Sequence, residues 1–258
     1  MRRTLPQLRA MKPGTAIAMC TAYDASQARL VDEAMDGILV GDSVAMVVQG
    51  HESTLPATLD EMVYHASMVT RGARQACVVG DLPFMSYQTS VEDALRAAGR
   101  LVKEAGVQAV KLEGGASVLP QVRALAACGV AVVGHLGLTP QSIGAFGGYG
   151  KRGKTETEAV RIRQDALALE EAGASMIVLE NIPHELAREI TGSLTVPTIG
   201  IGAGPHCDGQ IQVFHDLFGF DPDFAPRHAV RYLEAGRDIR AAAARYADDV
   251  RAGRITSK

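Results

Sequence analysis

The sequence predicts an α/β protein built as a single (β/α)8 TIM barrel, and three observations support this fold class. Short apolar runs of strand length alternate with longer amphipathic stretches along the chain. The runs are continuously apolar, which is typical of parallel strands buried on both faces. Eight of them occur without a linker or a change of composition, and 258 residues is a usual barrel length. An open doubly wound sheet is the alternative, because periodicity does not report closure.

The predicted strands are named here by residue numbers. They lie at 17–24, 37–43, 76–83, 109–115, 130–137, 176–183, 197–204 and, least clearly, 211–216. The eighth has the weakest signal because DGQIQVFHDLFG is also compatible with a helix. We expect one domain over 1–258, with an N-terminal helical extension at about 3–12 and C-terminal helices from about 226.

Helix starts between the strands are marked by capping residues. Thr58 with Glu61, and Thr155 with Glu158, have the spacing of a capping box, in which a hydroxyl and a carboxylate satisfy the first free N–H groups. Asp24 ends the first run and precedes Ser26, and we favour a helix cap for it over a catalytic role.

Composition narrows the function classes. The net charge of −3 gives no basic surface suited to nucleic acid or an anionic membrane, and 47% hydrophobic residues exclude intrinsic disorder. The four cysteines form no CxxC pair, which argues against structural zinc and a secreted disulfide framework. The longest N-terminal apolar run, 16–20, is too short for a membrane span or signal segment. We therefore expect a soluble protein of the cytoplasm.

Polar residues end several predicted strands on their carboxyl side. These are Asp24, Asp42, Asp81, Glu113, His135 and Glu180. In a parallel barrel these strand ends converge on one face, where barrel enzymes have their active sites. Any one of them could be a loop carboxylate or a cap, but so many on successive strands predict a site.

Three of these carboxylates, Asp42, Asp81 and Glu113, lie on separate strands without a thiolate or imidazole cluster. Hard oxygen ligands of this kind suit Mg²⁺. Lys111 lies two residues before Glu113, so both side chains point to the same side of their strand. A buried lysine needs an anionic partner, which is either a substrate or one of the carboxylates Glu113 and Asp81.

Glu180 follows the apolar run Met-Ile-Val-Leu, which leaves its carboxylate partly desolvated, as suits a general base. His135, between glycines in GHLG, either contacts substrate or is a satisfied core histidine. Ser43 either offers a hydroxyl or N–H group to an anion or belongs to a simple turn.

Two glycine-rich segments resemble nucleotide-binding motifs. GIGAG at 200–204 lacks the third glycine of GxGxxG, since Pro205 stands there. Residues 148–155 formally satisfy GxxxxGK[ST], but no strand directly precedes Gly148, so a P-loop is disfavoured. We expect the segment 138–154 to be a long mobile loop over the barrel mouth.

Several segments resemble one family, that of ketopantoate hydroxymethyltransferase, in order and spacing over about residues 15 to 220. They are VGDSVAMVVQGHESTLPAT, GDLPFMSY, VKLEGG, GHLGLTPQS, FGGY, VLENIP, PTIGIGAG and DGQIQVFHDLFG. The resemblance implies a barrel of the phosphoenolpyruvate mutase and isocitrate lyase type. It also implies transfer of a hydroxymethyl group from 5,10-methylenetetrahydrofolate to 3-methyl-2-oxobutanoate, which forms 2-dehydropantoate for pantothenate and coenzyme A synthesis. Members of the family assemble as homodecamers.

The resemblance also implies roles for individual residues. The Mg²⁺ ligands of the family fall on Asp42, Asp81 and Glu113, its 2-oxo acid contacts on Asp42, Ser43, Asp81 and Lys111, and its proton acceptor on Glu180. His135 is expected to help position the substrate. Two departures from the family pattern are Val44-Ala45 after Ser43 and the basic residues of 151–154.

Three other functions compete with this one. A carbon–carbon or carbon–phosphorus lyase on the same barrel often carries a KKCGH-type loop, and no such string occurs in this sequence. Nucleotide binding through 148–155 is the second. The third is an inactive barrel that serves as a scaffold, which would not need clustered carboxylates.

Overall fold

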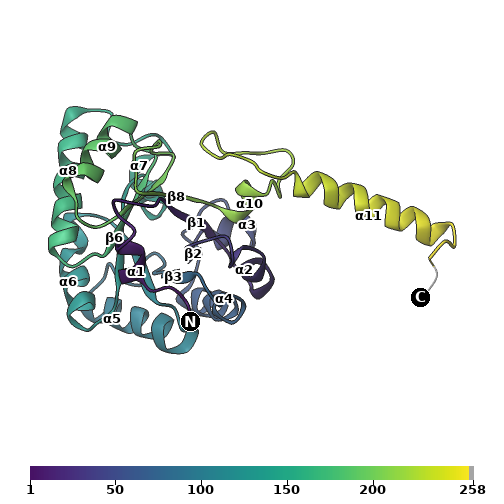
Figure 1. Ribbon diagram of the computed structural model, residues 1–258, viewed down its shortest axis with the longest axis horizontal. Coiled ribbons are helices and arrows are strands. Elements are labelled where there is room, and N and C mark those ends of the chain that lie inside the picture. Colours follow the sequence, from purple (N-terminus) through teal and green to yellow (C-terminus); the bar gives the residue numbers. More distant parts are fainter. Residues whose placement is uncertain (256–258) are drawn as a thin grey trace. The chain divides into compact units, whose positions relative to one another are not determined.

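The computed structural model describes residues 1–255 and contains a closed barrel of parallel strands in the order β1 to β8 (Figure 1). The strands are β1 (Ile17–Thr21), β2 (Gly37–Val40), β3 (Cys77–Asp81), β4 (Ala109–Glu113), β5 (Val132–Gly137), β6 (Met176–Glu180), β7 (Thr198–Ile201) and β8 (Gly209–Gln212). The barrel prediction is confirmed, and the open sheet is excluded.

Helices α2, α4, α5, α6, α8 and α9 lie around the strands (Figure 1). The helices are α1 (Leu5–Arg9), α2 (Ala25–Val31), α3 (Val44–Val47), α4 (Leu59–Gly72), α5 (Val91–Arg100), η1 (Leu101–Ala105), η2 (Ala116–Val118), α6 (Leu119–Ala127), η3 (Pro140–Ser142), α7 (Ile143–Phe146), α8 (Glu156–Glu171), α9 (His184–Ser193), α10 (Phe214–Leu217) and α11 (Ala235–Arg251).

The predicted helix caps are largely confirmed. Thr58 and Glu61 form a complete capping box at α4. Asp24 caps α2 by accepting hydrogen bonds from the N–H groups of Ser26 and Gln27. At α8, Thr155 accepts from the N–H of Glu158, but the carboxylate of Glu158 turns to the N–H of Gly153 instead of closing the box.

The eighth strand and the C-terminal helix differ from the prediction. The strand runs over 209–212, earlier than the predicted 211–216, and Phe214–Leu217 is the helix α10. The C-terminal helix α11 begins at Ala235 and not at about 226, because the segment before it forms turns. Near the N-terminus, helix α1 covers Leu5–Arg9 of the predicted extension at 3–12.

Two compact units make up the chain, one formed by Met1–Ile211 and one beginning at Gln212. The second unit packs the ring of Phe214 against those of Phe218 and Phe220, with centroids 4.7 Å and 5.6 Å away. A single domain over 1–258 stays a prediction.

The inside of the barrel is apolar at its amino-terminal end. Inward side chains of successive strands, including Met19, Val79 and Ile199, form one buried cluster. Leu5 and Leu8 of α1 are almost fully buried in the same cluster. Helix α1 therefore closes this end of the barrel, which leaves the opposite end for polar groups.

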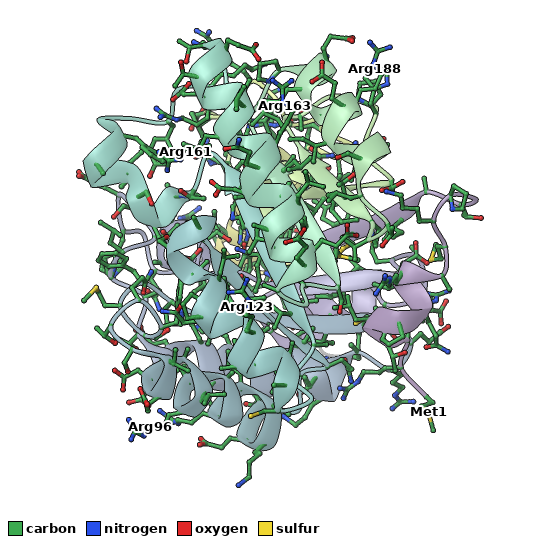
Figure 2. The ribbon with its side chains drawn as sticks, turned by 90° about the vertical axis from the view of Figure 1, so that its left-hand side faces the viewer. Met1, Arg96, Arg123, Arg161, Arg163 and Arg188 are labelled. Atoms are coloured by element: carbon green, nitrogen blue, oxygen red, sulfur yellow. The ribbon has the colours of Figure 1, made fainter. Side chains whose placement is uncertain are left out.

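The outer surface of the barrel helices carries many arginines, several of which are labelled in Figure 2. Those in ion pairs with acidic side chains include Arg96, Arg161, Arg163 and Arg188. Much of the positive charge on this face is therefore balanced locally. Within residues 1–255, no helix is both long and apolar enough to cross a membrane.

Candidate active site

The inward positions of several strands change from apolar to charged along the strand. Ala109 of β4 belongs to the buried apolar cluster, and Lys111 and Glu113 follow it on the same face. The same alternation leads from Val133 to His135 on β5 and from Met176 to Glu180 on β6. The pleat of the strands thus gathers charged side chains at the carboxyl end of the barrel interior.

Lys111 lies between two carboxylates contributed by β3 and β4. Its Nζ is 2.9 Å from Oδ1 of Asp81 and 3.8 Å from Oε1 of Glu113, and all three side chains are at most 5% exposed. The parallel register sets Asp81 directly opposite Lys111. Lys111 thus forms ion pairs with both carboxylates that the sequence offered as its partners. A contact between Lys111 and a 2-oxo acid stays a prediction.

His135 lies between Glu113 and one further carboxylate, that of Glu180. Its Nδ1 lies 3.1 Å from Oε1 of Glu113, and its Nε2 lies 3.2 Å from Oε2 of Glu180. Glu180 is less buried than the others, with 16% of its side chain exposed. Because both ring nitrogens face carboxylates, contact between His135 and substrate stays a prediction.

Asp42 and Ser43 follow β2 in the turn that leads into α3. The N–H of Asp42 donates to Oδ2 of Asp81 at 3.0 Å, and the Ser43 hydroxyl lies 2.8 Å from the hydroxyl of Tyr23. Val44 and Ala45, which depart from the family pattern, are fully buried in α3. The turn therefore holds Asp42 against Asp81. Only 4% of the Asp42 residue is exposed.

Two buried residues of this site, Gln141 and Tyr87, were missed by the sequence reasoning. The amide Nε2 of Gln141 donates to Oδ2 of Asp42 at 2.9 Å. The hydroxyl of Tyr87 donates to Oε1 of Gln141 at 2.7 Å and accepts from the N–H of Glu113 at 2.9 Å. Both residues stand inside the segments GHLGLTPQS and GDLPFMSY, which was the available signal.

The carboxylates of this site differ in pKa because their neighbours differ. Burial, with the charges of Asp81 and Glu113, raises the pKa of Asp42 to about 8. Burial also raises the pKa of Asp81, although Lys111 opposes the change. Burial alone would do the same to Glu113, but His135 and Lys111 together lower its pKa.

The two basic groups respond to the same carboxylates. Burial and the Lys111 charge act to lower the pKa of His135, but Glu113 and Glu180 raise it to about 9. Burial likewise opposes ionisation of Lys111, and the Asp81 and Glu113 charges raise its pKa above the ordinary value. The surrounding carboxylates therefore favour the charged forms of both Lys111 and His135.

The donor chemistry suits a hard divalent cation. Asp81 and Glu113 end the strands β3 and β4, and Asp42 lies in the turn after β2. The pKa values of Asp42 and Asp81 are raised, and a cation would stabilise such crowded carboxylates in their charged form. Mg²⁺ is usually bound through one or two carboxylates, with waters or substrate oxygens completing its shell. Over residues 1–255, no three His, Cys, Asp or Glu side chains are already grouped to hold a metal ion. The three-carboxylate ligand set stays a prediction.

The segment 138–154, predicted as a long mobile loop, contains the short helices η3 and α7 and contacts neighbouring elements, and its mobility stays a prediction. The guanidinium of Arg152 lies 4.2 Å from the ring centroid of Phe146 and pairs with Glu158 of α8. The N–H of Arg152 also donates to the carbonyl of Asn181, directly after Glu180. A P-loop requires a strand directly before its first glycine, but the element before Gly148 is the helix α7. The N–H of Gly153, which a P-loop would offer to a phosphate, donates to Glu158.

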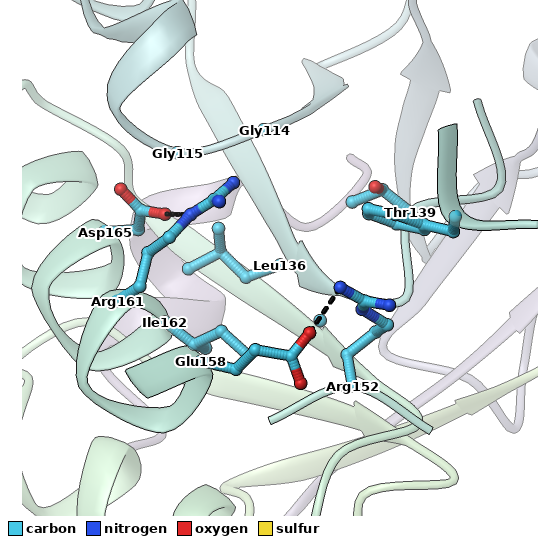
Figure 3. A pocket seen from close by; sticks show the side chains of 11 residues that line it. Gly114, Gly115, Leu136, Thr139, Arg152, Glu158, Arg161, Ile162 and Asp165 are labelled. Atoms are coloured by element: carbon cyan, nitrogen blue, oxygen red, sulfur yellow. Dashed lines mark ion pairs between the residues drawn. The ribbon is translucent and has the colours of Figure 1, made fainter. Parts of the chain in front are cut away.

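A small cavity of about 80 Å³ lies beside this segment (Figure 3). It is lined by Gly114, Gly115 and Gly137 and by the ion pairs Arg152–Glu158 and Arg161–Asp165. A Cβ atom at Gly115 would lie 2.0 Å from Cγ of Asp165. Close backbone approach at Gly115 therefore lets the loop after β4 pack against α8.

A family model for ketopantoate hydroxymethyltransferase matches residues 2–257. The chain belongs to this family. The curated 3-methyl-2-oxobutanoate hydroxymethyltransferase of Moorella thermoacetica is 54% identical over 98% of this chain and 95% of its own length. That of Heliobacterium modesticaldum is 53% identical over 97% and 91%.

Among solved structures, a 2,3-dimethylmalate lyase described as a PEP mutase/isocitrate lyase superfamily member aligns with a TM-score of 0.63 at 18% identity, over 98% of this chain and 89% of that one. At this identity the likeness concerns the fold alone. The ketopantoate hydroxymethyltransferase family, the barrel type and the class of transferase enzymes are thus confirmed as predicted, and the predicted activity is the one for which the relatives are named.

Proposed function

We propose that this chain transfers a hydroxymethyl group from 5,10-methylenetetrahydrofolate to 3-methyl-2-oxobutanoate and so forms 2-dehydropantoate, a precursor of pantothenate and coenzyme A. The observation that carries the proposal is the link Glu113–His135–Glu180 beside the buried pair Asp81–Lys111, in a chain of this family. It joins positive charge suited to an anionic substrate with a carboxylate suited to take a proton.

Glu180 is the general base in this proposal. It removes the proton from C3 of the 2-oxo acid, and the electron pair moves into the adjacent carbonyl to give an enolate. C3 then attacks the methylene carbon carried by the folate, and the two bonds between this carbon and the folate nitrogens break. Water supplies the oxygen of the new hydroxymethyl group. The proton taken from C3 and the second proton of the water end on the two nitrogens, so tetrahydrofolate leaves. Glu180 is the most exposed carboxylate of the link, which is consistent with access to substrate.

The other side chains bind and orient. The Lys111 charge offsets negative charge on the 2-oxo acid, and Ser43 offers a hydroxyl or N–H group to its carboxylate. His135 lies 3.2 Å from Glu180, at ion-pair distance, and keeps the carboxylate of the base beside the site. Asp42, Asp81 and Glu113 would hold Mg²⁺. When bound, Mg²⁺ supplies positive charge for the carboxylate and keto oxygens of the substrate.

Proton NMR of 3-methyl-2-oxobutanoate in D₂O with the protein tests this proposal, with and without Mg²⁺. We expect metal-dependent loss of the C3 proton signal, and a new hydroxymethyl signal once methylenetetrahydrofolate is added. A folded protein that produces neither change would contradict the proposal. ATP binding would then be tested at 148–155.

We propose further that the protein acts in the cytoplasm as a homodecamer, as the family resemblance implies. Ile239, Tyr246 and Val250 recur along α11 at helical spacing and are each at least half exposed, which is consistent with contacts to other copies. Light scattering should give the mass of ten chains of 27.3 kDa. A monomer mass at micromolar concentration would exclude the decamer.

A further inference from the structure

Gln141 lies among the carboxylates of the active site, although it comes from η3 and not from a strand. The residue is 4% exposed. Gly137, with a φ of +94°, ends β5 and turns the chain, and the N–H of Leu138 then donates to the carbonyl of Glu180. This turn carries the following residues back over the barrel interior, where Gln141 reaches Asp42.

The amide of Gln141 uses its full hydrogen-bonding capacity. Nε2 donates to Oδ2 of Asp42 and to the carbonyl of Leu82, both at 2.9 Å. Oε1 accepts from the hydroxyl of Tyr87 at 2.7 Å and from Nε2 of Gln88 at 3.0 Å. Two donors and two acceptor sites are thus all matched.

These contacts allow one orientation of the amide. If it were flipped, Oε1 would face the backbone carbonyl of Leu82, which is an acceptor only, and the 2.9 Å hydrogen bond to that carbonyl would be lost. The Gln141 amide is therefore a fixed donor toward Asp42.

Gln141 also binds a second carboxylate through its main chain. Its N–H donates to Oε2 of Glu113 at 3.0 Å, while His135 Nδ1 faces the other oxygen of Glu113 at 3.1 Å. Asp42 and Glu113 belong to the ends of β2 and β4, which are separated by β3. One residue thus connects two carboxylates that do not lie on neighbouring strands.

The terminal torsion of a carboxylate side chain is broad, so a carboxylate without such contacts takes many orientations. We propose that Gln141 is a positioning residue, which fixes the Asp42 and Glu113 carboxylates in the orientation that binds a divalent cation and a 2-oxo acid. This inference rests on the proposed function. Gln141 acts through the two carboxylates and through no contact of its own with the reacting atoms.

The test is the variant Gln141→Met, which keeps the side-chain length and removes the amide. Mg²⁺ binding is measured by isothermal titration calorimetry, with no folate present, on wild type and variant. We expect the Mg²⁺ dissociation constant to rise about 10-fold to 100-fold, the range for loss of an outer partner of a metal ligand. The KM for 3-methyl-2-oxobutanoate should rise with it.

Gln121→Met is the matched control. Gln121 is 6% exposed, and its amide donates to the carbonyl of Tyr87 without touching a carboxylate. Both variants should lower the unfolding midpoint, but Gln121→Met should bind Mg²⁺ as the wild type does. Equal Mg²⁺ affinity in wild type and Gln141→Met would overturn the positioning role while leaving the proposed function intact.

A second variant covers the case in which Gln141→Met does not fold. Tyr87→Phe removes the hydroxyl that donates to Oε1 of Gln141, and it should weaken Mg²⁺ binding several-fold. Unchanged Mg²⁺ affinity in Tyr87→Phe would then overturn the inference. Wild type that neither binds Mg²⁺ nor transfers the hydroxymethyl group would overturn the proposed function, and this inference with it.

Discussion

Nε2 of His135 lies 3.2 Å from Oε2 of Glu180, on the neighbouring strand of the barrel. The opposite ring nitrogen lies 3.1 Å from Glu113. A single imidazole therefore connects the proposed base with a carboxylate of the proposed cation site. Because His135 lies at ion-pair distance from both carboxylates, the reactivity of Glu180 should depend on His135.

Glu180→Gln should abolish most of the turnover while leaving ligand binding nearly unchanged. The amide has almost the shape of the carboxylate but does not take a proton, so turnover should fall by a factor of about 10² or more. Binding of Mg²⁺ and of 3-methyl-2-oxobutanoate is followed by calorimetry, and transfer by NMR. Turnover like that of wild type would remove Glu180 from the role of base.

His135→Gln should reduce turnover less than Glu180→Gln, by about 10-fold to 100-fold, because glutamine can replace only part of the link between Glu113 and Glu180. The decisive measurement is the double variant. If His135 acts through Glu180, adding His135→Gln to Glu180→Gln should lower turnover little further. Losses that simply multiply would show that the two residues act independently.

The strand ends of this site were predictable because side chains alternate along a strand. Once β4 is recognised, Lys111 and Glu113 must share a face, and the ion pairs of Lys111 confirm the prediction. Gln141 and Tyr87 were not predictable in this way. They come from connections whose path depends on individual turns, such as the positive φ at Gly137, and not on a periodic pattern.

The eighth strand was misplaced for a related reason. Gly209–Gln212 is short, and only Gly209 and Ile211 are buried, so the apolar run starting at Ile211 drew the predicted strand toward α10. The C-terminal helix was predicted too early because the turns before Ala235 have no strong break signal beyond Pro226. Both errors lie at the end of the chain, where the regular alternation of apolar strands and amphipathic helices stops.

Gly137→Ala should lower both stability and turnover. A Cβ at Gly137 would lie 2.2 Å from the carbonyl oxygen of Glu180, so the alanine has to displace the backbone that carries the proposed base. The φ of +94° adds strain of about 1–3 kcal/mol for a non-glycine residue. We expect turnover to fall at least about 10-fold, since small errors of position have large effects on catalysis.

Gly129→Ala is the control for this strain. Gly129 has a similar φ of +82°, but no heavy atom lies within 4 Å of the added Cβ. This variant should lose stability of about 1 kcal/mol and keep the wild-type turnover. Urea unfolding and the transfer assay, run on both variants, separate backbone strain from displacement of Glu180. Equal turnover in the two variants would contradict the displacement.

Asp32→Asn should destabilise the barrel in a pH-dependent way. The buried carboxylate of Asp32 accepts hydrogen bonds from the N–H groups of Arg74, Gln75 and Ala76, which lead into β3. Burial alone would raise the pKa of Asp32, but these N–H groups lower it below the ordinary value. An asparagine keeps one acceptor oxygen, so we expect a loss of about 1–3 kcal/mol in the free energy of unfolding at pH 7.

The sign of the pH dependence follows from the lowered pKa. Stabilisation by ionised Asp32 is fully present above the unfolded-state pKa, about 3.9, and is lost as the pH falls through the lower folded-state pKa. The difference in unfolding free energy between wild type and Asp32→Asn should therefore be constant from pH 7 to pH 5 and shrink below about pH 4. Glu33→Gln, at the exposed neighbouring position, should differ little from wild type throughout. A difference for Asp32→Asn that stays constant down to pH 3 would mean that the carboxylate charge contributes nothing, and that shape alone makes Asp32 important.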